Sequence, residues 1–149
     1  MQANLGYELT NAILATADAF LRESQRLFRP HGITGAQYNV LNILSTRPDG
    51  ISQRELGDLL VVDRSNVTGL LDRLEKAGWV RRADHPADRR VYQIFLTPEG
   101  RRLWSIVHPR YLAVLEQVTG NVPRTRARAC VETLRELERA AGTWELPDA

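Results

Sequence analysis

The sequence predicts a mainly α-helical fold with one small β-hairpin, and three observations indicate it. Two short helical segments follow one another between Ser52 and Gly78. At Gly78 the apolar spacing changes from helical to alternating, which is typical of two strands joined by a polar turn. At Thr97-Pro98 the pattern becomes helical again. Helix, turn, helix and hairpin in this order are typical of a winged helix-turn-helix.

The two short helices have clear start and stop signals. Ser52-Gln53-Arg54-Glu55 is a capping box, in which the Ser52 hydroxyl accepts from the third helical N–H and Glu55 reaches back to the Ser52 N–H. Asp63 is the predicted N-cap of the second helix, and Gly78 its left-handed stop. The apolar positions of that second helix are Val67, Leu70, Leu71, Leu74 and Ala77. A turn of this length sets the second helix across the first, where it can enter a DNA groove.

The second helix has a small and polar outer face near its N-terminus. Ser65, Gly69, Asp72 and Lys76 lie nearly opposite the apolar set, and Asn66, Thr68 and Arg73 lie on the flanks. Short hydroxyl and amide side chains can hydrogen-bond base edges, and Gly69 adds no bulk. Asp72 would have to lie beyond the phosphates or pair with a cation. The alternative interpretation is an ordinary solvated face of a surface helix.

The predicted hairpin has a basic tip. Residues 79–84 and 91–96 are rich in β-branched and aromatic side chains, and the polar stretch 85–90 between them is the predicted turn. Arg89 and Arg90 lie where guanidinium groups can reach a narrow minor groove, and Asp88 can fix one of them by a charge-assisted bond. A solvated charged turn is the alternative.

The rest of the chain is predicted to be helical. Apolar stripes indicate helices over 9–28, from Thr34 to about Thr46, over 98–118 and over 127–141. Thr34-Gly35-Ala36-Gln37 is a second capping box. A strand of one or two residues at Gly50-Ile51 is expected to edge the hairpin.

Length and composition fit one ordinary globular domain. The chain has 149 residues, of which 43% are hydrophobic and 26% charged. It has no signal-like N-terminus and no long apolar run, so we expect no membrane partner and a cytoplasmic location. The net charge of +2 is small, but seven basic and four acidic residues fall between Arg64 and Arg90. The single cysteine, Cys130, lies on an apolar stripe, which favours a buried and inert thiol over a redox switch.

Catalytic and metal-binding motifs are missing from the sequence. His31, His85 and His108 have no paired-ligand spacing, and there is no phosphate-binding glycine loop or nucleophile elbow. We therefore expect no enzyme, no cofactor and no metal site.

Several of these motifs together resemble the MarR family of bacterial transcription regulators. The resemblance rests on Asp63 through Gly78, on Gly78-Trp79-Val80-Arg81-Arg82, on Asp88-Arg89-Arg90 and on Leu96-Thr97-Pro98-Glu99-Gly100, and it extends over nearly the whole chain. It implies that Arg90 enters the minor groove, that Asp88 orients the wing and that Arg73 contacts backbone phosphate. It also implies that the N-terminal half of the second helix reads bases.

The terminal helices suggest a dimer. We divide the single domain, 1–149, into a winged helix-turn-helix unit at 34–97 and dimerisation helices at 1–30 and 98–146, whose apolar stripes would stay partly exposed in a monomer. Two-fold symmetry would place two recognition helices about 34 to 36 Å apart, as a palindromic operator requires. The alternative is that these helices only cover the core of a monomer.

The sequence thus favours a homodimeric, DNA-binding transcription regulator, a repressor released by a small molecule. The alternatives are an architectural or protein-interaction winged helix, for which minor-groove arginines would have no use, and an enzyme. The predicted DNA-binding residues are Ser52, Gln53, Arg54, Arg64, Ser65, Asn66, Thr68, Arg73, Asp88, Arg89 and Arg90. His31, Tyr38, Trp104 and His108 are candidates for a pocket that takes an aromatic or phenolic effector. The alternative is that these four are core and capping residues.

Overall fold

The computed structural model describes residues 4–60, 66–85 and 88–143, and at His85 and residues 88–91 it describes the backbone alone. The chain forms two compact units, residues 1–111 and 112–149, and the boundary falls within one long helix. The predicted Asp63, Arg64 and Ser65 lie outside the described residues. Each unit is described by itself below.

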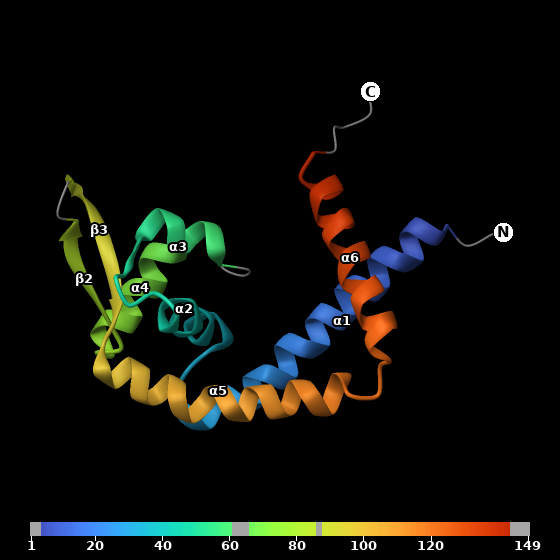
Figure 1. Ribbon diagram of the computed structural model, residues 1–149, viewed down its shortest axis with the longest axis horizontal. Coiled ribbons are helices and arrows are strands. Elements are labelled where there is room, and N and C mark those ends of the chain that lie inside the picture. The colour runs from blue at the N-terminus through green and yellow to red at the C-terminus, as the bar shows by residue number, and fades with distance from the viewer. Residues whose placement is uncertain (1–3, 61–65, 86–87, 144–149) are drawn as a thin grey trace. The chain divides into compact units, whose positions relative to one another are not determined.

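The first unit contains a helical layer and a small sheet (Figure 1). Its helices are α1 (Leu5–Phe28), the 3-10 turn η1 (Arg29–His31), α2 (Gly35–Ser45), α3 (Gln53–Leu59) and α4 (Val67–Lys76). The strands β1 (Ile51–Ser52), β2 (Val80–His85) and β3 (Asp88–Leu96) form an antiparallel sheet in the order β1-β3-β2. Helix α5 (Pro98–Thr119) begins in this unit and ends in the second, which also contains α6 (Arg124–Ala141). The predicted mainly helical fold with a small β-wing is confirmed.

The predicted helix starts at Thr34, Ser52 and Thr97 are present. At α2 both capping-box bonds form, because the Gln37 N–H donates to the Thr34 hydroxyl and the Thr34 N–H donates to Gln37 Oε1. At α3 the Ser52 hydroxyl accepts from the N–H of Glu55 at 3.1 Å. At α5 the Thr97 hydroxyl accepts from the N–H of Gly100 at 3.0 Å. These bonds are local, so residue types alone identify them.

One predicted boundary falls outside the described residues, and another was wrong. Helix α4 begins at Val67 with Asn66 at its N-cap position, whereas the predicted N-cap, Asp63, lies outside the described residues. The hairpin strands are longer than predicted, since β2 runs to His85 and β3 begins at Asp88. Asp88, Arg89 and Arg90 therefore lie in a strand and not in the turn. The pairing register shifts between Asp84 and His85, which allows the strands to pair beyond the point where alternation ends in the sequence.

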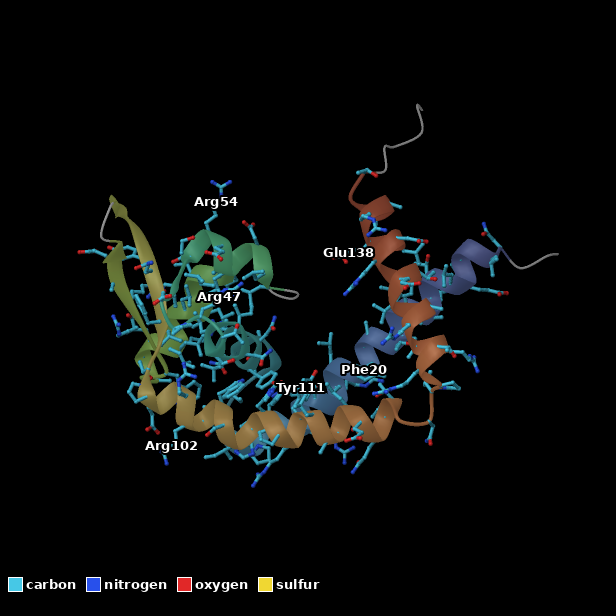
Figure 2. All side chains as sticks on the ribbon, in the orientation of Figure 1. Phe20, Arg47, Arg54, Arg102, Tyr111 and Glu138 are labelled. Atoms are coloured by element: carbon cyan, nitrogen blue, oxygen red, sulfur yellow. The ribbon has the colours of Figure 1, made fainter. Side chains whose placement is uncertain are left out.

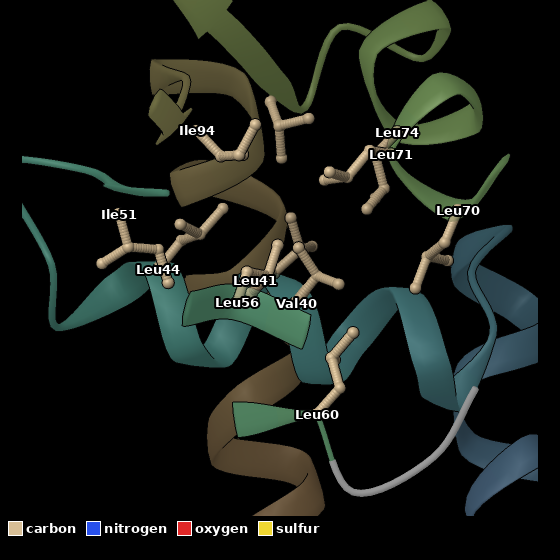
Figure 3. Close-up of a cluster of buried hydrophobic side chains, with 11 residues drawn as sticks. Val40, Leu41, Leu44, Ile51, Leu56, Leu60, Leu70, Leu71, Leu74 and Ile94 are labelled. Carbon is tan, nitrogen blue, oxygen red and sulfur yellow. The ribbon is translucent and has the colours of Figure 1, made fainter. Parts of the chain in front are cut away.

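The main core of the first unit lies between α2, α3, α4 and the sheet (Figure 3). Leu41 and Leu44 of α2 and Leu71 and Leu74 of α4 are fully buried there, with Ile94 of β3 against them. The predicted apolar face of α4 is thus confirmed at its centre. Ala77, the last residue of the predicted stripe, is exposed.

The end of α4 and the start of α5 meet at the base of the wing. Gly78 has φ of +75°, the predicted left-handed stop of α4. The Thr97 hydroxyl donates to the Gly78 carbonyl at 2.7 Å, and the Thr97 N–H donates to the Trp79 carbonyl at 3.1 Å. Gly100 is buried, and a Cβ there would overlap the Trp79 carbonyl oxygen. The first turn of α5 therefore packs backbone to backbone against the start of β2.

Several large apolar side chains are exposed. In the first unit they include Leu5, Tyr7 and Leu14 of α1. In the second unit none of the described residues is buried. Its exposed large apolar residues are Leu112, Val118, Val122, Val131 and Leu134.

Two further predictions concern the thiol and the membrane. Cys130 of α6 is exposed, so the expectation of a buried thiol was wrong. None of the described helices is long and apolar enough to cross a membrane.

Candidate nucleic-acid interface

Helix α4 separates its apolar and polar residues sharply. Leu70, Leu71 and Leu74 are buried against the core, whereas Asn66, Thr68 and Asp72 are exposed. At about 100° per residue, Asp72 lies nearly opposite the buried face. The exposed side of α4 is therefore free to meet another molecule along its first two turns.

The first turn of α4 is bonded to α3 and carries the side chain of its own N-cap residue, Asn66. Gln53 of α3 donates from Nε2 to the Thr68 hydroxyl at 2.9 Å. The Asn66 side chain lies over Gly69, because a Cβ at Gly69 would come within 2.5 Å of Asn66 Oδ1. Two predicted base-reading residues, Asn66 and Thr68, thus lie on one turn, and Gly69 provides the space for the Asn66 amide.

Helix α3 provides one cation and one cap at this interface. Arg54 is exposed and points away from the core (Figure 2). Ser52 is half-buried, and its hydroxyl is occupied by the cap of α3. Arg54 is therefore available to a phosphate, whereas the Ser52 hydroxyl already accepts the Glu55 N–H that caps α3.

Arg82 of β2 lies against α4 from the side of the wing. Its guanidinium bonds to Glu75 Oε2 at 2.6 Å and to Asp72 Oδ1 at 2.7 Å, and its N–H donates to Glu75 Oε1 at 3.0 Å. The backbone bond from Arg82, more than the ion pair, holds the pKa of Glu75 below its ordinary value. Asp72 thus has the cationic partner that the sequence required of it.

The wing carries an aromatic residue on each face. The Arg81 guanidinium lies 4.1 Å from the centroid of the Phe95 ring, a cation–π contact. Tyr92 is exposed, and it pairs with Asp84 on the opposite face of the ribbon from Phe95. The backbone of Asp88, Arg89 and Arg90 runs in β3, and their side chains lie outside what the structure describes.

Arg73 lies on the other flank of α4 from Glu75. It is exposed and borders a cleft of about 640 Å³ between α1, the start of α2 and α4. The cleft is lined by Leu21, Ser24, Gln25, Thr34, Gly35, Ala36, Leu70 and Arg73. The four predicted effector residues do not line it.

Three of the four predicted effector residues pack into one cluster. The Tyr38 hydroxyl lies 2.7 Å from His108 Nδ1, and the His108 ring stacks on Trp104 at 4.6 Å between centroids. Trp104 Nε1 donates to Asn42 Oδ1 at 3.2 Å. His31 lies apart from these rings in contact with Arg110, 3.1 Å from its guanidinium. The structure thus brings together α2 and α5 residues that are far apart in sequence.

Burial controls the chemistry of Tyr38. The ring is 5% exposed and stacks on Phe28 at 4.7 Å, and burial, with a smaller contribution from Tyr111, raises the pKa of Tyr38 to about 12. Tyr38 therefore keeps its proton at neutral pH, and its hydroxyl shares a hydrogen bond with His108 Nδ1 whose direction depends on the His108 tautomer. His31, Trp104 and His108 are half-buried and keep part of their surface in solvent.

Sequence reasoning missed Arg82, Asn42 and Arg110. The acidic residues Asp72 and Glu75, spaced i and i+3 on one side of α4, were a signal that a cation must lie beside that helix. Nothing in the sequence pattern identified Asn42 and Arg110 as partners of Trp104 and His31. Among the residues that the structure describes, no group of three or more His, Cys, Asp or Glu is placed to hold a metal ion.

An α4 that exposes polar residues between α3 and a β-wing defines a winged helix-turn-helix protein. Residues 31–91 match the model of the MarR family. The HTH-type transcriptional regulator TtmR of Methylorubrum extorquens (strain PA1) is 36% identical over 148 residues, which cover 98% of this chain and 75% of TtmR. The chain belongs to the MarR family of transcription regulators, and it is not an enzyme.

Solved structures agree with this assignment. CouR from Rhodococcus jostii RHA1, bound to p-coumaroyl-CoA, is 28% identical with a TM-score of 0.77, and the match covers 98% of this chain and 100% of CouR. Sco3205 from Streptomyces coelicolor, a MarR family regulator in complex with DNA, is 24% identical with a TM-score of 0.84. That match covers 94% of this chain and 90% of Sco3205, and it shows the fold.

Proposed function

We propose that this regulator is a cytoplasmic homodimer that represses transcription by binding a palindromic operator. The observation that carries the proposal is α4, whose apolar face is buried while Asn66 and Thr68 remain exposed between α3 and the wing. The N-terminal half of α4 would read bases in the major groove, and the Arg90 guanidinium would enter the minor groove.

The exposed apolar residues support the dimer. Helix α6 has no buried residue, and Leu5, Leu14 and Leu134 remain in solvent in a single chain. Burying such side chains against a second copy is favourable by about 25 cal/mol per Å². We therefore assign dimerisation to the helices within 1–30 and 98–146, and DNA binding to 34–97.

Selection of bound duplexes from random DNA tests the operator. We expect an inverted repeat with half-site centres separated by about one helical turn, or 10 to 10.5 base pairs. Light scattering after gel filtration should give twice the mass of the chain. A monomer, or a selected pool with no sequence in common, would favour a protein-interaction winged helix instead. A reporter with the selected site at its promoter distinguishes repression from activation.

The Arg90→Ala variant should lose part of this affinity. Replacing a specific groove contact costs about 1 to 3 kcal/mol, and Asp88→Ala should cost less because Asp88 only orients the wing. Gel shift at stated salt measures the loss, and melting temperature and dimer mass should stay near those of the parent protein. Unchanged DNA affinity in Arg90→Ala would contradict the wing assignment.

Residues of α4 that read bases and the one that contacts phosphate should change DNA binding in different ways. We expect Asn66→Ala to relax base preference at particular half-site positions, whereas Arg73→Ala should weaken all sequences alike and reduce the salt slope by about one unit. Thr68→Ala should behave as Asn66→Ala does, although it also loses the bond from Gln53. Affinity for selected and mixed duplexes at several salt concentrations measures both. An altered base preference in Arg73→Ala would reverse the roles.

We also propose an aromatic or phenolic effector that binds beside His31, Tyr38, Trp104 and His108. The half-buried rings of Trp104 and His108 support it, as does the p-coumaroyl-CoA bound to the similar protein CouR. The ligand would release DNA only if it bound the DNA-incompetent spacing of the two α4 helices more tightly.

A panel of aromatic acids and phenols, titrated against the protein–DNA complex, tests the effector site. We expect at least one to dissociate the complex, with a weaker effect in His31→Ala and Tyr38→Ala. Dissociation that persists undiminished in both variants would place the site elsewhere, for example in the cleft beside Arg73.

A further inference from the structure

Arg82 joins the wing to the recognition helix along two helical turns. Besides its bonds to Asp72 and Glu75, its guanidinium lies 3.5 Å from the carbonyl oxygen of Thr68. These three positions are spaced i, i+4 and i+7, so they lie on one side of α4. A single strand residue thus contacts both the first and the last turn of the helix.

The Arg82 side chain is mostly covered, and its partners are not. Its exposed fraction is 17%, against 60% for Asp72 and 40% for Glu75. Because this guanidinium is bonded to two carboxylates and mostly covered, it is poorly available to a phosphate. Asp72, by contrast, lies on the outer side of α4, where DNA would approach.

The charges of this cluster matter for binding a polyanion. Asp72 and Glu75 carry two negative charges beside the helix, and Arg82 cancels one of them. Charges on the DNA-facing side act on phosphates within a Debye length, about 8 Å at physiological salt. Without the guanidinium, an uncancelled pair of carboxylates would face the DNA backbone.

Thr68 links this cluster to base reading. Its carbonyl faces Arg82 from the wing, and its hydroxyl accepts from Gln53 of α3. The turn of α4 that carries Asn66 and Thr68 is therefore fixed from both neighbours. A change at Arg82 would release one of the two supports and alter how these side chains meet the bases.

We propose that Arg82 is a positioning residue for DNA recognition, which orients α4 against the wing and cancels the repulsion of Asp72 and Glu75 without contacting DNA itself. The proposal rests on the DNA-binding function proposed above. It predicts that the DNA affinities of variants follow the net charge of the cluster of Arg82, Asp72 and Glu75, whether or not arginine is present at position 82.

The test compares four variants on two probes, the best duplex selected from random DNA and a mixed-sequence duplex of the same length. Arg82→Gln makes the cluster one charge more negative, and Asp72→Asn makes it one charge more positive. The triple variant Arg82→Gln, Asp72→Asn, Glu75→Gln is neutral, and Arg82→Lys keeps the charge without the fork. Arg102→Gln is the matched control, because it removes a guanidinium from an exposed pair with Glu99 on α5.

We expect Arg82→Gln to weaken binding to the mixed duplex roughly tenfold at 0.15 M salt, as one more uncancelled charge within a Debye length would. Asp72→Asn should bind the mixed duplex more tightly than the parent protein. The triple variant should bind the mixed duplex at least as well as the parent but discriminate less between the two probes. Arg82→Lys should keep the parent's affinity for the mixed duplex and lose discrimination, and Arg102→Gln should match the parent protein on both probes.

Two results would overturn the proposal. If the triple variant binds the mixed duplex as weakly as Arg82→Gln, then Arg82 contacts phosphate directly. If discrimination between the probes is unchanged in Arg82→Gln, Arg82→Lys and the triple variant, Arg82 does not orient α4. Circular dichroism and melting temperature identify an unfolded variant. If the variants at Arg82 do not fold, the affinity of Asp72→Asn for the mixed duplex tests the proposal, and an affinity no higher than that of the parent protein contradicts it. Failure of the parent protein to bind any duplex would refute the DNA-binding function instead.

Discussion

The Leu71→Ala variant should lose about 2 to 5 kcal/mol of the free energy of unfolding, the range for truncating a fully buried leucine. Leu71 has no exposed surface and lies at the centre of the core, between α2 and the sheet. Because domains of this size are stable by only about 5 to 15 kcal/mol, the loss is a large share of the total. Urea unfolding followed by circular dichroism measures it.

The matched control is Leu59→Ala on α3. Leu59 is 41% exposed, so its truncation should cost less than about 1 kcal/mol. DNA affinity of Leu71→Ala should fall together with the folded fraction, because Leu71 holds α4 in place. Equal unfolding free energies for the two variants would contradict the position of the core.

The Gly100→Ala variant should be destabilised by about 1 to 3 kcal/mol or more, the usual cost of forcing extra atoms into a packed site. The added methyl group would overlap the Trp79 carbonyl oxygen and approach Leu96 Cδ1 to 2.9 Å. A backbone oxygen cannot rotate away as a side chain can. The first turn of α5 would have to move from the base of the wing and strain the bonds of Thr97.

The control for this substitution is Gly57→Ala in α3. A Cβ at Gly57 would lie 3.5 Å from Val67 Cγ2, an ordinary contact, and alanine favours helix over glycine by up to about 1 kcal/mol. We expect Gly57→Ala to melt at or above the temperature of the parent protein. A Gly100→Ala protein that melts as high as Gly57→Ala would show that α5 does not pack against Trp79 as described.

The local signals of the sequence predicted much of the fold. The capping box at Thr34, the Ser52 cap and the glycine stop at Gly78 depend on residues at most three apart, so the residue types suffice to locate them. The change of apolar period at Gly78 likewise predicted the wing. Family membership rests on the same kind of information, namely ordered motifs along one chain.

Boundaries that depend on competing local preferences were less predictable. Helix α4 begins at Val67 with Asn66 before it, and the predicted N-cap, Asp63, lies outside the described residues. The wing strands also extend beyond the residues that alternate in the sequence, because pairing between β2 and β3 continues through a register shift at Asp84. Cross-strand hydrogen bonds decide where such strands end, and the sequence of one strand does not contain them.

The sequence by itself determined the helix-turn-helix order, the polar face of α4 and the basic composition around it. Only the tertiary structure decided which of these side chains are bonded to side chains of other elements. It joins Arg82 to Asp72 and Glu75, Gln53 to Thr68, and Tyr38 to His108. The physical reason is distance along the chain: Tyr38 and His108 are brought together by packing of α2 and α5, and helical spacing carries no information about contacts between separate elements.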